Sequence, residues 1–195
     1  MRYTTTTALI VVDVQNDFAD PDGSLYVPGG EETIPFINEQ AREARDAGAL
    51  VVYTQDWHPR ETPHFQEFGG PWPVHCVAGT KGAQFHPDLV VVEGALHVKK
   101  GKGGEDGYSA FCLRDPESGE ESSTGLAADL EDAGIETTAI VGLALDYCVK
   151  ETALDAARLN LSPTLLADGS RAVNLQIGDG ARAVAEMVTA GVEIS

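Results

Sequence analysis

Three of the chain's five histidines fall in one short segment, together with an aspartate. Asp56 and His58 are separated by one residue, and His64 and His75 follow. Side chains alternate along an extended segment, so Asp56 and His58 point to the same side. A mixed set of carboxylate and imidazole favours Zn²⁺, Fe²⁺ or Mn²⁺ over Ca²⁺. The segment indicates a metal site, although solvated histidines, or His75 packing beside Cys76, would explain the same spacing.

Cys148 stands where an apolar run meets a helix-like segment, within residues 141–150. Near the start of a helix, unpaired backbone N–H groups and the helix dipole lower a thiol's pKa and can hold an oxyanion. Asp146 is a candidate cap for this helix. Cys76 and Cys112 lack such a setting. The pattern indicates a nucleophile, with a small buried core residue as the alternative.

A cysteine nucleophile needs a proton acceptor and a neighbouring cation. Once the clustered histidines are assigned to a metal, Asp13 and a lysine remain available at strand ends. Three of the five lysines lie together, at Lys99, Lys100 and Lys102. A carboxylate can take the thiol proton, and an ammonium group favours the thiolate. The pattern therefore predicts an Asp–Lys–Cys site.

Short apolar runs alternate with helix-like segments along the chain. Strands are predicted at 8–12, 50–53, 138–143 and 164–167, helices at 34–47, 147–159 and 179–190, and short apolar stretches at 89–92, 96–98 and 192–194. Runs that are apolar on both faces and separated by helices indicate a doubly wound, Rossmann-like parallel sheet of the α/β class, with helices on both faces. Such sheets bind ligands at the carboxyl ends of their strands, where the candidate residues fall. The long segments 57–86 and 101–124 are expected to carry function there.

Length and composition limit the classes of protein that fit. A chain of 195 residues suits one domain, spanning 1–195. Its net charge of −18 repels phosphate backbones, which argues against nucleic acid and anionic membranes as partners. No apolar run is long enough to span a bilayer, and three unevenly spaced cysteines imply no disulfide framework. We expect a cytoplasmic protein, with His86 and His97 in structural positions.

Taken in order, the motifs resemble those of the isochorismatase-like cysteine hydrolases. Asp13–Phe18 resembles the family's opening motif, Lys100-Gly101 its lysine–glycine step, and Gly142–Val149 its nucleophile turn. The segments Gln55–His58 and Trp72–Thr80 resemble the nicotinamidase branch of the family, which carries a metal. The glycine after Lys100 selects it from the three clustered lysines.

The resemblance implies a catalytic trio of Asp13, Lys100 and Cys148. The backbone N–H groups of Ala144 and Cys148 match the oxyanion hole of the family. The peptide between Leu143 and Ala144 matches one that is cis in relatives.

The resemblance also implies one divalent metal ion, with Zn²⁺ as the first choice and Fe²⁺ or Mn²⁺ as alternatives. Its ligands would be Asp56, His58 and His75, and His64 is a ligand in some relatives only. The residues expected around the substrate are Phe18, Leu25, Trp72, Tyr108 and Leu143.

The activity implied by the resemblance is hydrolysis of nicotinamide to nicotinate and ammonia through a thioester on Cys148, as a step of NAD salvage. The expected partner is a small-molecule amide, and a homo-oligomer is compatible with the sequence. One alternative is a related amidohydrolase that acts on another amide or on a carbamoyl group. A second alternative is a non-catalytic domain in which the metal only stabilises the long segment 57–86.

Overall fold

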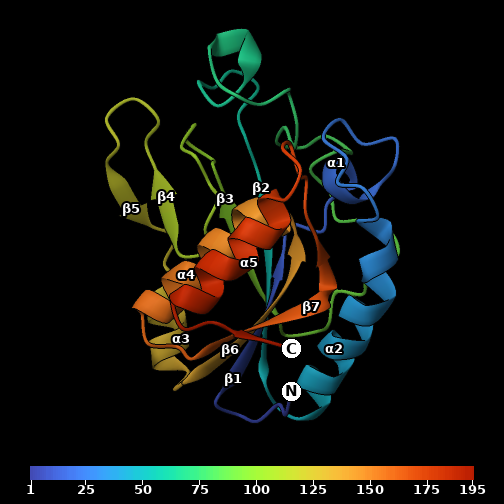
Figure 1. The fold of residues 1–195 in the computed structure, drawn as a ribbon, viewed down its shortest axis with the longest axis vertical. Coiled ribbons are helices and arrows are strands. Elements are labelled where there is room, and N and C mark those ends of the chain that lie inside the picture. Colours follow the sequence, from blue (N-terminus) through green and yellow to red (C-terminus); the bar gives the residue numbers. More distant parts are fainter.

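The computed structural model describes all residues, 1–195, and is built on a six-stranded parallel sheet (Figure 1). The strands lie in the order β3-β2-β1-β6-β7-β8. Their bounds are β1 (Thr7–Val12), β2 (Leu50–Asp56), β3 (Leu96–Lys100), β6 (Thr137–Leu143), β7 (Pro163–Arg171) and β8 (Glu193–Ile194). The predicted fold class is confirmed.

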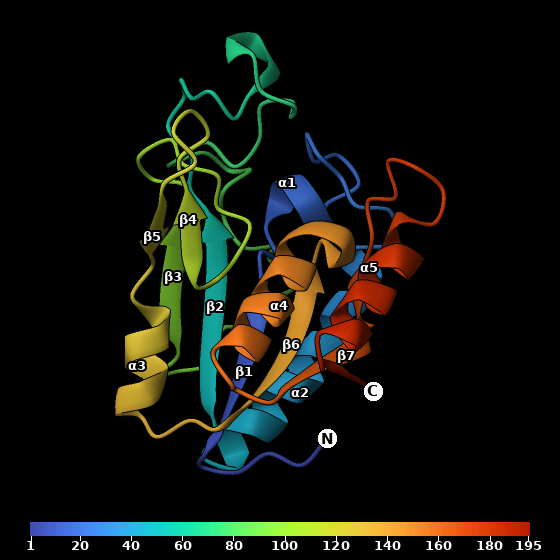
Figure 2. The same cartoon turned by 60° about the vertical axis from the view of Figure 1, so that its left-hand side comes forward.

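Helices cover both faces of this sheet because its central strand is apolar on both sides. Along β1, Leu9 and Val11 pack with the helix α2 (Ile34–Asp46), while Ile10 packs toward the opposite face. Figure 2 shows these two layers, with α2 behind the sheet and a second layer of helices in front of it. The helices of the second layer are α3 (Leu126–Asp132), α4 (Lys150–Arg158) and α5 (Asp179–Thr189).

The structure departs from the sequence-based expectation in one helix and contains elements that were not predicted. The helix expected at 147–159 is a π-helical turn, Leu145–Val149, followed by α4. The apolar stretch 89–92, to which no element was assigned, forms no strand, and its buried Leu89 and Val92 pack with the α2 side of the core. The short helix α3 and a hairpin of β4 (Cys112–Arg114) and β5 (Glu121–Ser123) were not predicted.

The carboxyl ends of the strands meet at one edge of the sheet, under the long connections. The segment 57–95 contains only one 3₁₀ turn, Gln66–Phe68, as regular structure. The short helix α1 (Asn16–Ala19) follows β1 at this edge, and a second 3₁₀ turn, Glu31–Thr33, precedes α2. None of the helices is both long and apolar enough to cross a bilayer.

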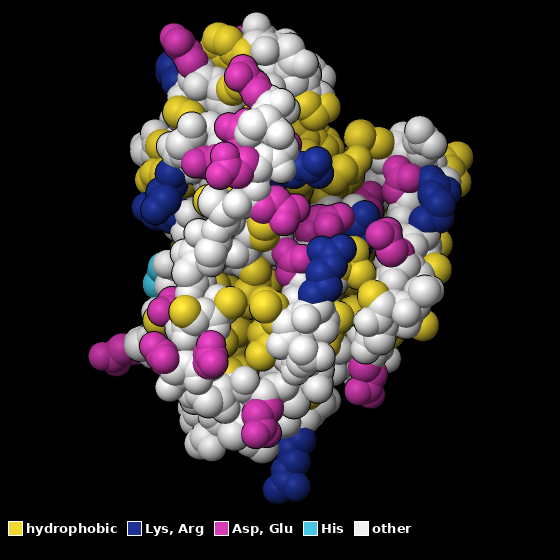
Figure 3. All heavy atoms as spheres, turned by 90° about the vertical axis from the view of Figure 1, so that its left-hand side faces the viewer, with side chains coloured by type: hydrophobic (Ala, Val, Ile, Leu, Met, Phe, Trp, Pro, Cys, Tyr) yellow, Lys and Arg dark blue, Asp and Glu magenta, His cyan; other side chains and the backbone are white.

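A groove lies between the hairpin and α4, on the face that Figure 3 shows. Its lining is mainly polar and includes Glu121, Glu151 and Asp155, together with Arg114 and Arg158. Acidic side chains are scattered over the rest of this face as well. The negative charge of this face is therefore not confined to the groove.

Candidate active site

Lys100 and Asp13 form a buried ion pair at the ends of β3 and β1. The Lys100 Nζ lies 2.6 Å from Asp13 Oδ2 and 3.1 Å from Asp56 Oδ1, and both Lys100 and Asp13 are fully buried. Asp13 has a left-handed backbone, with φ of 49°, which Asp tolerates better than most residues. Thr54, two residues before Asp56 on β2, donates its hydroxyl to Asp13 Oδ1 at 2.6 Å. The neighbouring Lys99 instead lies over the ring of Trp57, 3.4 Å from its centroid.

Burial is the largest single influence on the pKa of both Asp13 and Lys100. It raises the pKa of Asp13 to about 6, although the charge of Lys100 acts in the opposite direction. Burial lowers the pKa of Lys100, but the carboxylates of Asp13 and Asp56 outweigh it and hold that pKa well above its usual value. Lys100 is therefore a permanent cation between two carboxylates.

Cys148 lies in the π-helical turn that follows β6. Its Sγ and one carboxylate oxygen each of Asp13 and Asp56 lie within 4.8 Å of one another. The N–H groups of Tyr147 and Val149 both donate to the Ala144 carbonyl, at 3.1 Å. The peptide between Leu143 and Ala144 is cis, as in the family pattern. The thiol and the two carboxylates therefore form one compact group at this edge of the sheet.

Two expectations about this turn are wrong. The pKa of Cys148 is raised well above its usual value, because burial and the carboxylates of Asp13 and Asp56 outweigh Lys100. Asp146 does not cap the turn, since it accepts hydrogen bonds from the N–H groups of Val173 and Asn174, at 2.9 and 2.8 Å. It ties the turn to the segment that follows β7. A thiol with a high pKa has to lose its proton to a base during attack.

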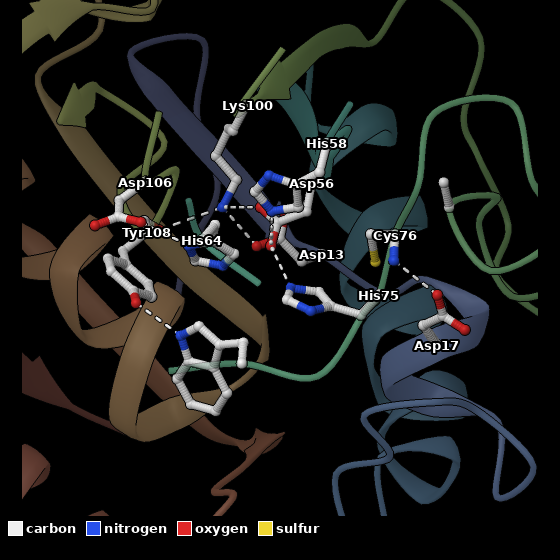
Figure 4. Close-up of polar contacts among 12 residues, drawn as sticks. Asp13, Asp17, Asp56, His58, His64, His75, Cys76, Lys100, Asp106 and Tyr108 are labelled. Atoms are coloured by element: carbon white, nitrogen blue, oxygen red, sulfur yellow. Dashed lines mark hydrogen bonds and ion pairs between the residues drawn. The ribbon is translucent and has the colours of Figure 1, made fainter. Parts of the chain in front are cut away.

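The clustered histidines converge beside this group (Figure 4). One ligand nitrogen each of His58, His64 and His75 lies within 4.8 Å of the others. Asp56 Oδ2 lies 3.6 Å from His58 Nε2 and 3.9 Å from His75 Nε2. None of the four side chains is more than 6% exposed. Asp56 is shared, with one oxygen toward Lys100 and the other toward the histidines.

The hydrogen bonds around this cluster fit a bound divalent cation. Both ring nitrogens of His58 are buried without a hydrogen-bond partner, which folded proteins rarely allow. His75 holds its Nδ1 2.8 Å from the Pro73 carbonyl, so that its Nε2 lone pair faces Asp56. Burial lowers the pKa of His75 to about 4, which keeps the ring neutral as a metal ligand must be. Burial raises the pKa of Asp56, but the Lys100 ammonium and His58 outweigh it and keep that carboxylate ionised.

A cavity of about 370 Å³, part of it open to solvent, connects Cys148 with the histidine cluster. Four of the five residues expected around a substrate line it, and so does Ala144. Its lining consists of Phe18, Leu25, Val27, Asp56, His64, Trp72, His75, Tyr108, Ala144, Tyr147, Cys148 and Val173.

Leu143 is the exception among the expected substrate residues. Its side chain is fully buried in the core on the α2 side, near Gly30, and does not line the cavity. Sequence reasoning missed Val27, Tyr147 and Val173, because isolated apolar residues carry no positional signal. It also missed Thr54, which strand alternation from Asp56 would have placed on the same side.

The opening motif does more than supply Asp13. Gln15 donates its side-chain amide to the Asp56 carbonyl and accepts the Asp56 N–H, both at 2.8 Å. Asp17 accepts the N–H of Cys76 at 2.7 Å, and its own N–H donates to the Gly82 carbonyl at 3.1 Å. The start of α1 therefore clamps the segment that carries the histidines.

The isochorismatase domain model matches residues 7–194, and the chain belongs to the isochorismatase family. The nicotinamidase of Acinetobacter baylyi is 40% identical over 210 residues, which cover 99% of this chain and 94% of that protein. The pyrazinamidase of Pyrococcus horikoshii in complex with zinc is 39% identical, with a TM-score of 0.86 over 97% of this chain and 98% of that one. PnC1 from L. infantum in complex with nicotinate is 38% identical, with a TM-score of 0.90 over 100% of this chain and 95% of that one.

Proposed function

We propose that this chain is a nicotinamidase, which hydrolyses nicotinamide to nicotinate and ammonia in NAD salvage. The observation that carries the proposal is the cavity, which has Cys148 on one side and Asp56, His64 and His75 on another. Aromatic side chains of Phe18 and Trp72 stand beside it, as a flat heteroaromatic ring requires. The nicotinamidase of Acinetobacter baylyi and the nicotinate complex of the L. infantum protein support this substrate.

The first half of the reaction forms a thioester. The Cys148 Sγ attacks the carboxamide carbon, and its proton passes to Asp13. The N–H groups of Ala144 and Cys148 hold the oxyanion that develops, which is the largest single contribution in many acyl transfers. Asp13 then gives the proton to the departing ammonia, while Lys100 balances the charge of the carboxylate throughout.

In the second half, water cleaves the thioester. Asp13 takes a proton from the water as it attacks, and returns that proton to the Cys148 sulfur as nicotinate leaves. A divalent metal held by Asp56, His58, His75 and His64, with zinc as our first choice, would supply a contact for the pyridine nitrogen and so orient the ring. Three free cysteines fit a reducing, cytoplasmic compartment.

The test compares nicotinamide with benzamide, which has almost the same shape but lacks the ring nitrogen. A site built around a polar contact rejects an analogue that lacks it, so we expect kcat/KM for benzamide to be lower by roughly 10²-fold or more. Ammonia release from the zinc-loaded protein is the measurement.

Cys148→Ala is the control, because it should release no ammonia from either amide while the protein stays folded. Cys112→Ser, which changes a thiol in the hairpin outside the cavity, should keep the wild-type rate. Equal rates on the two amides with zinc bound would contradict the nicotinamidase proposal.

A further inference from the structure

Asp106 touches the histidine cluster from outside it. This residue follows the glycine-rich segment after Lys100, and its Oδ1 lies 2.6 Å from the Nδ1 of His64. The side chain of His64 is 3% exposed and that of Asp106 is 23% exposed. Asp106 belongs neither to the catalytic trio nor to the proposed ligand set.

The contact fixes which nitrogen of His64 can bind a metal. A carboxylate at hydrogen-bond distance accepts a proton, so the Nδ1 of His64 carries the hydrogen and the lone pair lies on Nε2. The ring stacks on that of His58, with centroids 4.5 Å apart. His75 reaches the same tautomer through the Pro73 carbonyl. The rings of His64 and His75 therefore both carry their lone pair on Nε2, where it can bind a metal.

Asp106 is held in place by the backbone around it. Its N–H donates to the Arg114 carbonyl at 2.7 Å, and the Arg114 N–H donates back at 3.0 Å. Thr62 joins the two segments, since its hydroxyl donates to the Gly104 carbonyl at 3.0 Å and accepts the His64 N–H at 3.2 Å. These bonds fix the carboxylate beside His64 without any help from a metal.

We propose that Asp106 is a positioning residue that makes His64 a metal ligand in this chain. Asp106 fixes the tautomer and orientation of the His64 ring, and its negative charge makes the Nε2 a stronger electron-pair donor to the metal. The inference rests on the proposed metal site and not on the substrate. A metal-affinity measurement therefore tests it even if nicotinamide is not hydrolysed.

The measurement is the zinc affinity of the full-length protein, by competition with a chromophoric chelator. Asp106→Ala should weaken zinc binding by roughly 10- to 100-fold, the range found for partners of metal-bound histidines. Asp106→Asn keeps an oxygen that accepts the Nδ1 hydrogen, and should recover part of the loss. Glu105→Gln is the matched control, because Glu105 bonds the Gly103 N–H and has no contact with His64, so affinity should stay at the wild-type value.

A double-mutant cycle distinguishes positioning from general support of the loop. In a His64→Ala background, Asp106→Ala should cause no further loss of zinc affinity, because the residue through which it acts is gone. The visible spectrum of the cobalt-substituted protein should change alike in His64→Ala and Asp106→Ala. An equal loss of affinity with and without His64, or no loss in Asp106→Ala, would overturn the proposal.

Discussion

Asp13 carries the most unusual chemistry of any single residue in the site. It is fully buried, yet it bonds both an ammonium group, on Lys100, and a hydroxyl, on Thr54. The pKa of about 6 puts its titration inside the range in which the protein can be assayed. In the proposed mechanism, the raised pKa of the Cys148 thiol makes turnover depend on the ionised form of Asp13.

We expect kcat/KM for nicotinamide to fall below a midpoint near pH 6, with zinc in excess. Asp13 is ionised above its pKa of about 6 and accepts the thiol proton, whereas below it the carboxyl group is protonated and cannot. The measurement is the pH profile of ammonia release. Asp115→Asn, a change in the exposed hairpin turn, should leave the profile unchanged, and Asp13→Asn should abolish turnover at every pH. A midpoint near 4, the ordinary value for an exposed aspartate, would contradict the assignment.

At the scale of elements, the clamp between α1 and the histidine segment is tight enough to exclude a methyl group. A Cβ on Gly82 would lie 2.1 Å from Asp17 Oδ2, the oxygen that accepts the Cys76 N–H. Gly82 is thus required by a close approach and not by its backbone angles.

We expect Gly82→Ala to lower the free energy of unfolding by about 1–3 kcal/mol, the usual cost of overpacking a tight contact. Asp17→Ala removes the clashing carboxylate, so the double variant Asp17→Ala with Gly82→Ala should lose less than the sum of the two single changes. Urea unfolding of the wild type, the two single variants and the double variant measures the coupling free energy between the two residues. Strict additivity would show that the two residues do not act on each other.

The elements that could be predicted from the sequence are those that depend on long apolar runs. The strands before Asp13 and at Asp56 were recognisable, whereas the stretch before Lys100 was recognisable only as a short apolar run. A parallel sheet brings those three residues to one edge. The hairpin of β4 and β5 could not be predicted, because its strands have three residues each and mostly polar side chains. Asp106 gave no signal either, since one carboxylate among 31 acidic residues does not stand out. Only the tertiary contact with His64 distinguishes it.

At the scale of the whole molecule, the net charge of −18 makes the compact state repel itself. We expect sodium chloride between about 0.01 and 0.1 M to raise the midpoint of thermal unfolding, as the Debye length falls from about 30 to about 10 Å. An increase in the free energy of unfolding on the order of 1 kcal/mol raises the melting temperature by about 2–4 °C for a chain of this size. Calorimetry at fixed zinc concentration measures it.

Charge reversal provides the control for this salt effect. Glu93 and Glu136 are exposed and form no ion pair, so Glu93→Lys with Glu136→Lys changes the net charge from −18 to −14 without removing a contact. The double variant should show a smaller increase with salt. A melting temperature that falls with added salt would contradict self-repulsion as the dominant effect.

The strand order has a consequence for a chain that grows from its N-terminus on the ribosome. A nascent chain that has reached residue 106 contains every proposed metal ligand and the carboxylate beside His64, but not Cys148. At that point β1 can pair with β2, but the other edge of β1 is unpaired, because its partner β6 begins only at Thr137. That open, apolar edge is a template for pairing with other chains until β6 covers it. All residues of the proposed metal site are thus synthesised before the proposed nucleophile and the closing strand.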